Sequence, residues 1–530
     1  MSESRKLPIG IHDFEKVRSE NYLYVDKSLF VYKMAKTGSF YFLTRPRFFG
    51  KTMLLSAVEA YFRGRRDLFE GLAISALEDE WQEYPVFTLD FSTDVYTQEG
   101  RLEDFLEAFL SEQETRYGKH QERRSFSSRF EHIIRRAYEI SGKPVVILID
   151  NYDKPILDAI FTPEENHNRD VLREFYSVLN GNDFYLKFVL MCGITKFASV
   201  NIFNGSNQAK DISFHKDFAN ICGFTQDEIQ ENFAPELEAF AADFSVSPQT
   251  ILKDVSDRYG GYNFVRQTDN FQKLYNPFSL LNALDSREFG SYWFQTGLPA
   301  MLIKMLQASR YDLFNIILGL SVDFESLSDY RWTEDDLITL IYQCGYLTLQ
   351  NSDAKNNLCH LGLPNAEVRQ GFLKGVLSFY TNIGTASRLG TEISQFTEQL
   401  KAGELALFFE HFSSIIKDIP AVKKKKETPE QIFLVAFHSI LQLTGFEVLQ
   451  PNSSLDIRND IILQTDTDIY VFILKADKGF PVEDVLADAL ARIDEKKYTA
   501  RYKDMGKTIH KVALVFNATT LGISDWKEIF

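Results

Sequence analysis

The feature that most constrains this chain is an octapeptide between a strand-like and a helix-like segment. Residues 39–44 (SFYFLT) form a short apolar run, residues 45–52 read RPRFFGKT, and a helical pattern begins directly afterwards. The octapeptide ends like the phosphate-binding loop G-x-x-x-x-G-K-[ST], whose backbone amides surround phosphates at a helix N-terminus. We therefore expect a P-loop (Walker A) nucleotide-binding domain in which Gly50, Lys51 and Thr52 contact the nucleotide.

A second motif supports this interpretation. Residues 145–151 (VVILIDN) are an apolar run that ends in Asp150, which is the Walker B pattern. In that pattern the carboxylate at the end of a buried strand helps to hold Mg²⁺. The loop hydroxyl, here Thr52, also ligates the ion, and the lysine, here Lys51, reaches the β- and γ-phosphates. ATP and Mg²⁺ are therefore the expected cofactors.

The residue after this aspartate predicts weak catalysis. Many ATPases carry a glutamate there, which orients or deprotonates the attacking water. This chain has Asn151, a neutral amide that cannot act as a base, and Asp153 is the nearby acid that would have to replace it. We expect nucleotide to bind and to turn over slowly or not at all.

The fold class follows from the pattern of apolar runs. Three further runs are continuously apolar, as buried parallel strands are, and they lie at residues 86–91, 145–149 and 186–192. Helical patterns between them, as at 102–117 and 168–179, predict an α/β domain with a parallel sheet. From about residue 223 the chain is mostly helical, and residues 333–350 suggest a winged-helix-like module.

Length and punctuation predict several domains. A chain of 530 residues exceeds one hydrophobic core. Four lysines at 423–426 are typical of a solvated linker, and residues 428–431 (TPEQ) form a strong helix start. We expect a P-loop domain at 1–222, a helical and winged-helix-like region at 223–380, a helical connector with a basic linker at 381–427, and a small α/β domain at 428–530.

Composition excludes some classes of protein. The net charge of −16 disfavours a nonspecific polyanion binder as a whole, although a local basic groove stays open. The cysteines are scattered and form no Cys-x-x-Cys pair, so neither a disulfide framework nor a zinc site is expected. The start resembles no signal peptide, and no apolar run is long enough to span a bilayer. We expect a cytoplasmic protein without a membrane partner; its oligomeric state stays open.

Several segments together resemble one known family. Besides the two motifs, these are residues 7–11 (LPIGI), 24–27 (YVDK), 150–156 (DNYDKPI), 193–197 (GITKF) and 275–279 (YNPFS). Over nearly its whole length the chain resembles the bacterial AAA-ATPase-like proteins common in gut Bacteroidetes. In that family a P-loop domain precedes a PD-(D/E)XK nuclease-like domain.

The resemblance assigns roles in the P-loop domain. Arg45 stands where the generic motif has its first glycine and is a family trait; it and Arg47 are expected to contact phosphates. Thr195 falls where such ATPases keep a polar residue that senses the γ-phosphate. The family commonly reads Asp-Glu-Tyr-Asp where this chain has DNYD, so Asn151 is a departure that again predicts weak or absent hydrolysis.

The resemblance also implies a restriction-endonuclease-like domain at the carboxyl terminus. Such a site holds Mg²⁺ with an aspartate on one strand and an acid on the next, and a lysine positions water. Asp460 and Lys475 match, and Glu430 aligns with the acid on the preceding helix. The second acid is replaced by Ile473, and Arg492 stands where glutamine is common. Because Mg²⁺ requires oxygen ligands, we expect a nuclease fold whose chemistry has decayed.

Three functions remain open from the sequence. The first is a nucleotide-responsive switch or scaffold whose carboxy-terminal domain recognises a protein partner or nucleic acid. The second is an active ATP-dependent nuclease in DNA processing, mobile-element biology or defence, in which Asp153 and Glu430 replace the missing acids. The third is an interaction module in which both folds are inert.

Overall fold

The computed structural model describes most of the chain, in two compact units. The described residues are 6–160, 162–196, 209–265, 273–295, 313–328, 337–353, 355–381, 383, 386–416, 428–449 and 459–530. The first unit comprises Met1–Met305 and Leu320–Val368, and the second comprises Leu306–Gly319 and Arg369–Phe530. The expected lysine linker lies outside the described residues. No helix in the described part is long and apolar enough to cross a membrane.

A parallel sheet forms the centre of the first unit and confirms the expected α/β fold. Its strands are β1 (Phe40–Thr44), β2 (Val86–Asp90), β3 (Val145–Asp150), β4 (Leu186–Gly193) and β5 (Lys210–Asp211). Their order is β2-β3-β4-β1-β5, and every neighbouring pair is parallel. Strand β3 is buried along its whole length, as its continuous apolar run predicts. The sequence did not indicate β5, because a two-residue Lys-Asp strand has no apolar run.

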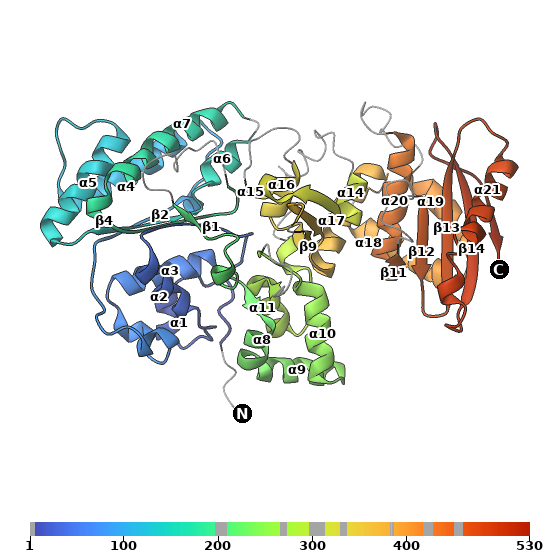
Figure 1. Ribbon diagram of the computed structural model, residues 1–530, viewed down its shortest axis with the longest axis horizontal. Helices are drawn as coiled ribbons and strands as arrows, with labels where there is room; N and C mark the ends of the chain where they lie inside the picture. Colours follow the sequence, from blue (N-terminus) through green and yellow to red (C-terminus); the bar gives the residue numbers. More distant parts are fainter. Residues whose placement is uncertain are drawn as a thin grey trace. The chain divides into compact units, whose positions relative to one another are not determined.

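Helices cover both faces of this sheet, as Figure 1 shows. On one face lie α1 (Phe14–Ser19), α2 (Ser28–Thr37) and α3 (Lys51–Phe62). On the other lie α4 (Arg101–Tyr117), α5 (Phe126–Ser141), α6 (Lys154–Ala159) and α7 (Glu164–Ser177). Since the carboxyl ends of parallel strands share one edge, β1, β2 and β3 bring the P-loop, Asp90 and Asp150 to the same edge.

The next part of the first unit is helical and then contains a small antiparallel sheet. The helices are α8 (Gln226–Asn232), α9 (Ala234–Phe244), α10 (Pro248–Tyr259), α11 (Pro277–Ser286) and α12 (Tyr292–Gln295), and β6 (Phe224–Thr225) pairs with β7 (Leu274–Tyr275). The expected winged-helix-like module at residues 333–350 falls on α16 (Leu337–Gln343) and part of β9 (Thr348–Asp353), in a region that also contains β8 (Leu320–Asp323), α15 (Phe324–Ser328) and β10 (Leu358–Gly362). Its sheet order is β8-β10-β9, with both pairs antiparallel.

The second unit contains a mixed sheet packed between helices. Helix α14 (Leu313–Leu318) belongs to this unit. The main segment of the unit begins at Arg369, within α17 (Ala366–Tyr380). Helices α18 (Ala386–Lys401), α19 (Leu405–Ile416) and α20 (Pro429–Leu443) precede the sheet. Its strands, in spatial order, are β11 (Glu447–Leu449), β12 (Asp460–Gln464), β13 (Asp468–Asp477), β14 (Thr508–Asn517) and β15 (Ile523–Ile529).

Alternating side chains of this second sheet face two helical layers. Val471 and Ile473 pack with Leu486 and Ile493 of α21 (Val482–Glu495). On the other face Phe516 stacks on Phe433 of α20, with ring centroids 4.0 Å apart. Helix α20 begins with the expected capping box between Thr428 and Gln431.

Candidate functional site

The phosphate loop joins β1 to α3 through a glycine in a left-handed conformation. Gly50 has φ +93° and is the N-cap of α3, so a side chain at this position would strain the turn. Lys51 is the first residue of α3, and its Nζ donates to the carbonyls of Arg45 and Pro46, at 2.9 Å each. Burial lowers the pKa of Lys51, and the nearby Asp150 carboxylate opposes that shift. The loop therefore holds the Lys51 ammonium at the start of a helix.

The hydroxyl and the carboxylate expected to hold Mg²⁺ are in contact. Thr52 Oγ1 donates to Asp150 Oδ2 at 2.5 Å. Burial raises the pKa of Asp150, while the hydrogen bond from Thr52 and the charge of Lys51 lower it. A hydroxyl, a carboxylate and nucleotide phosphates are the oxygen donors that Mg²⁺ prefers, so this pair fits the ion.

A cavity of about 780 Å³ opens beside this pair, within the size range of small-molecule sites. Its lining from the P-loop half includes Arg47, Lys51, Thr52, Asp90 and Asn151. Further lining residues come from α12 (Trp293) and from the turn between α16 and β9 (Cys344 and Tyr346). The cavity combines charged groups from the P-loop half with aromatic groups from the middle region.

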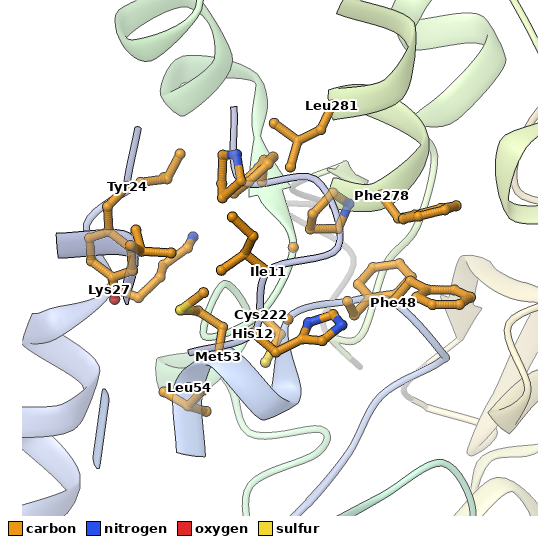
Figure 2. A pocket seen from close by; sticks show the side chains of 18 of the residues that line it. Ile11, His12, Tyr24, Lys27, Phe48, Met53, Leu54, Cys222, Phe278 and Leu281 are labelled. Carbon is orange, nitrogen blue, oxygen red and sulfur yellow. The ribbon is translucent and has the colours of Figure 1, made fainter. Parts of the chain in front are cut away.

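A second, apolar pocket of about 120 Å³ adjoins the loop (Figure 2). Ile11, Tyr24, Met53, Phe278 and Leu281 are among the side chains that line it. This pocket shares His12, Phe48 and Gly50 with the larger cavity. A flat apolar group and a polyanion attached to it therefore have two adjoining compartments that share residues of one loop.

The middle region contacts the backbone of the phosphate loop. The carbonyl of Arg47 accepts hydrogen bonds from Asn276 Nδ2 at 3.3 Å and from Trp293 Nε1 at 3.2 Å. Phe48 stacks on Phe278, with centroids 4.6 Å apart. Gly345 approaches so closely that a Cβ there would lie 2.6 Å from Cβ of Pro46. A movement of the loop would therefore change its contacts with the helical and winged-helix-like parts.

Arg45 does not lie where the sequence predicted. Its guanidinium is buried and donates to the carbonyls of Thr44 (2.9 Å), Ser213 (2.7 Å), Phe218 (3.2 Å) and Ala219 (3.4 Å). It also lies 4.2 Å from the ring centroid of Phe264. These contacts give Arg45 a structural role in place of the expected phosphate contact, whereas Arg47 lines the cavity.

The structure brings Asp153 and Thr195 together. Asp153 Oδ2 accepts from the amides of Ile194 (2.9 Å) and Thr195 (2.6 Å) and from Thr195 Oγ1 (2.7 Å). Both side chains are buried, and burial raises the pKa of Asp153. Asp153 thus braces the segment after β4. This geometry supports neither the expected replacement of the missing glutamate by Asp153 nor a free Thr195 hydroxyl facing a phosphate.

Asn151 points to a carboxylate that sequence reasoning missed. Its φ is +53°, in the left-handed region that asparagine tolerates better than most residues. Its Nδ2 donates to Asp90 Oδ1 at 3.1 Å. The available signal was that residues 86–90 (VFTLD) end an apolar run with an aspartate, as residues 145–150 (VVILID) do.

In the second unit, the aspartate expected in the nuclease-like site forms an ion pair with an arginine. Asp460 is fully buried, and its Oδ2 accepts from Arg492 Nε (3.1 Å), Arg492 Nη2 (2.9 Å) and Tyr498 Oη (2.6 Å). Its cross-strand partner is Ile473, which is also buried. Its Oδ1 is buried without a hydrogen-bond partner in the described part of the chain.

The other two expected nuclease residues have separate partners. Lys475 Nζ contacts Asp488 at 2.9 Å, and Glu430 accepts from Asn459 Nδ2 at 3.2 Å and lies 3.7 Å from Lys478 Nζ. No group of three His, Cys, Asp or Glu side chains that could hold a metal ion occurs among the described residues. One carboxylate paired with a guanidinium and faced by an isoleucine does not fit Mg²⁺, which requires several oxygen ligands.

Comparisons with known proteins find one family match in the amino-terminal part of the chain and another in the carboxy-terminal part. Residues 8–203 match a family described as predicted AAA-ATPase, and residues 428–526 match the PD-(D/E)XK nuclease superfamily. A protein of Azotobacter chroococcum mcd 1, described as an uncharacterized protein in the vnfD 5′ region, is 30% identical over 526 residues, covering 97% of this chain and 96% of the relative. Among solved structures, the Aeropyrum pernix ORC1 protein in complex with DNA covers 65% of this chain and 91% of its own, with 13% identity and a TM-score of 0.23. That structural likeness is too distant to bear on function.

Proposed function

Because the chain belongs to the bacterial AAA-ATPase-like family with a carboxy-terminal PD-(D/E)XK nuclease-like domain, we propose that it is an ATP-binding switch or scaffold with weak hydrolysis. The observation that carries this proposal is the contact of Thr52 with Asp150 beside Lys51, within a cavity that the middle region completes. Lys51 would bind the β- and γ-phosphates, and Thr52 and Asp150 would hold the Mg²⁺ that neutralises them.

The adjoining apolar pocket would take the base. Its wall includes Ile11, Met53 and Leu281, and it meets the larger cavity at Gly50. Because the faces of an adenine ring are largely apolar, moving the ring from water to such a wall is favourable. The nucleotide would then lie across the loop, with its base against the segment at residues 8–12 and its phosphates against α3.

The switch would work through the carbonyl of Arg47. Asn276 and Trp293 both donate to it, and the loop that presents it would surround the phosphates. A rearrangement of the loop between ATP and ADP would change these two hydrogen bonds and the stacking of Phe48 on Phe278. A ligand shifts an equilibrium only as far as it binds the two states differently, so ATP and ADP must differ in their effect.

The nuclease-like domain would serve as a binding module for a protein or nucleic-acid partner. The pairing of Asp460 with Arg492 leaves no charge for a metal to compensate, which supports a loss of cleavage chemistry. An active ATP-dependent nuclease would need acids that the geometry does not gather at Asp460.

The test is Mg²⁺-ATP binding and phosphate release in the full-length protein. We expect Lys51→Ala to weaken ATP binding at least tenfold, about 1.4 kcal/mol, with wild-type release well below that of ordinary ATPases. Lys16→Ala, at an exposed lysine on α1, is the matched control and should bind normally. Trp293 fluorescence should respond differently to ATP and ADP, and Trp293→Phe should abolish that difference. Equal binding by wild type and Lys51→Ala, with folding intact, would reject nucleotide binding at this loop.

A further inference from the structure

We propose that Asp90 is the catalytic carboxylate of the slow hydrolysis, and that it orients the attacking water and takes its proton. This inference rests on the proposed binding of ATP in the same cavity. Asp90 is the last residue of β2, and its register partner on β3 is Asp150. Neighbouring strands are about 4.8 Å apart, so Asp90 lies one strand away from the residue that would hold Mg²⁺.

Asn151 holds Asp90 where a glutamate would otherwise act. The residue after the Walker B aspartate is the usual origin of the water-orienting carboxylate. Here that residue ends in an amide, which cannot accept a proton, and the amide nitrogen lies 3.1 Å from Asp90 Oδ1. The carboxylate of Asp90 therefore lies within hydrogen-bond distance of the position 151 side chain, at the same edge of the sheet.

The remaining contacts of Asp90 fix the orientation of its carboxylate and leave an acceptor site for a further hydrogen bond. The amide of Ser92 donates to Oδ1 at 2.8 Å, and the hydroxyl of Ser92 donates to Oδ2 at 2.7 Å. A carboxylate has about four acceptor sites, so three neutral donors leave one for water. Asp90 is partly exposed, lines the cavity, and forms no ion pair within the part of the chain that the structure describes.

The other acids of the cavity are already engaged. Asp153 is buried and holds Thr195 and Ile194 through three hydrogen bonds. Asp158 forms an ion pair with Lys154. Asp150, which lies outside the cavity lining, contacts Thr52 and would be a metal ligand. Asp90 is thus the carboxylate of this lining that combines exposure, a fixed orientation and neutral neighbours.

The step is an in-line displacement at the terminal phosphorus. The water oxygen forms a bond to the γ-phosphorus as the bond from that phosphorus to the β,γ-bridging oxygen breaks. Asp90 accepts one water proton and releases it to the phosphate or to solvent, so that ATP and water become ADP, inorganic phosphate and a proton. Lys51 would stabilise the negative charge that develops on the leaving β-phosphate.

The experiment compares turnover and binding in Asp90→Asn. Asparagine keeps the acceptor for the amide of Ser92, so the turn is preserved while the base is lost. We expect kcat for Mg²⁺-ATP to fall about 100-fold or more, towards the Lys51→Ala background, since general-base catalysis contributes at least that factor. The Kd of a non-hydrolysable ATP analogue and the melting temperature should stay within twofold and about 2 °C of wild type.

Two further variants make the result specific. Asp94→Asn removes a carboxylate from the same connection but outside the cavity lining, and it should leave kcat unchanged. The exchange Asp90→Asn with Asn151→Asp moves the carboxylate to β3, and it should restore kcat to within about tenfold of wild type, because aspartate also tolerates a positive φ.

The outcomes separate the two proposals. Loss of kcat in Asp90→Asn with intact analogue binding, and recovery in the exchange, would support Asp90. Unchanged kcat in Asp90→Asn, or wild-type turnover no higher than that of Lys51→Ala, would overturn the role of Asp90 while leaving nucleotide binding in place. Absence of analogue binding by the wild type would overturn the proposed function itself.

Discussion

Asp150 and Asp460 are two buried aspartates on the sheets of the two units, and they meet different partners. Asp150 receives the neutral hydroxyl of Thr52, with Lys51 nearby, beside a cavity. Asp460 receives a guanidinium and a phenol, and its opposite residue is an isoleucine. A hydroxyl leaves the charge of a carboxylate available to a cation, whereas a guanidinium neutralises it. Asp150 therefore has a neutral hydroxyl as its side-chain contact beside a cavity, whereas the carboxylate of Asp460 is paired with a cationic side chain.

The largest expected effect tests the neutralised site. Arg492→Ala would leave Asp460 as a buried, uncompensated charge, which typically costs about 3–5 kcal/mol of unfolding free energy. Urea denaturation followed by circular dichroism measures it. Asp460→Ala combined with Arg492→Ala should cost less than Arg492→Ala alone, because the pair is then removed together.

Arg501→Ala is the control for that prediction. Arg501 is exposed and lies 4.7 Å from the ring centroid of Tyr502, so its removal should cost about 1 kcal/mol or less. Arg492→Ala with no greater loss than Arg501→Ala would mean that the pairing with Arg492 does not stabilise the fold, and it would remove the contrast between the two sites.

An intermediate effect is expected from rebuilding the metal site. Arg492→Gln with Ile473→Glu frees Asp460 and supplies a second carboxylate from the strand that pairs with it. We expect Mn²⁺ affinity, measured by calorimetry, to rise at least tenfold over wild type, or about 1.4 kcal/mol. Arg492→Gln alone should gain less. A folded double variant with wild-type Mn²⁺ affinity would show that the arginine is not what excludes the ion.

The smallest effect is a pH-dependent one at Asp150. Burial raises the pKa of Asp150 in the folded state, so between the unfolded and the raised value the folded protein binds more protons. Stability from this group is therefore present at low pH and declines as pH rises through the raised pKa. Asp150→Asn should remove that decline and raise the melting temperature at pH 7 more than at pH 4.

The same substitution at the other aspartate should act in the opposite direction. Asp460→Asn weakens the hydrogen bonds from Arg492 and should lower the melting temperature at pH 7. Thermal melts of both variants at the two pH values provide the check. A loss of stability in both would mean that Asp150, like Asp460, is already compensated by its neighbours.

The sequence alone predicted much of the fold and part of the site. Periodicity at residues 40–44, 86–90, 145–150 and 186–193 was sufficient for a parallel sheet, because a buried strand needs a continuous apolar run. The spacing of Gly50, Lys51 and Thr52 predicted the turn before α3, and the capping box predicted the start of α20 at Thr428. These are local rules, in which a residue and its near neighbours in sequence decide the outcome.

Only the tertiary structure decided which side chains meet across long separations. The guanidinium of Arg45 is held by carbonyls of residues 213–219, Asp153 is held by the end of β4, and Asp90 is held by Asn151 of the next strand. Arg492 reaches Asp460 from a helix more than 30 residues further along the chain (a separation of 32). No periodicity encodes such partners, because they follow from how strands and helices pack, and packing decides whether a charge is left for a ligand or used by the protein itself.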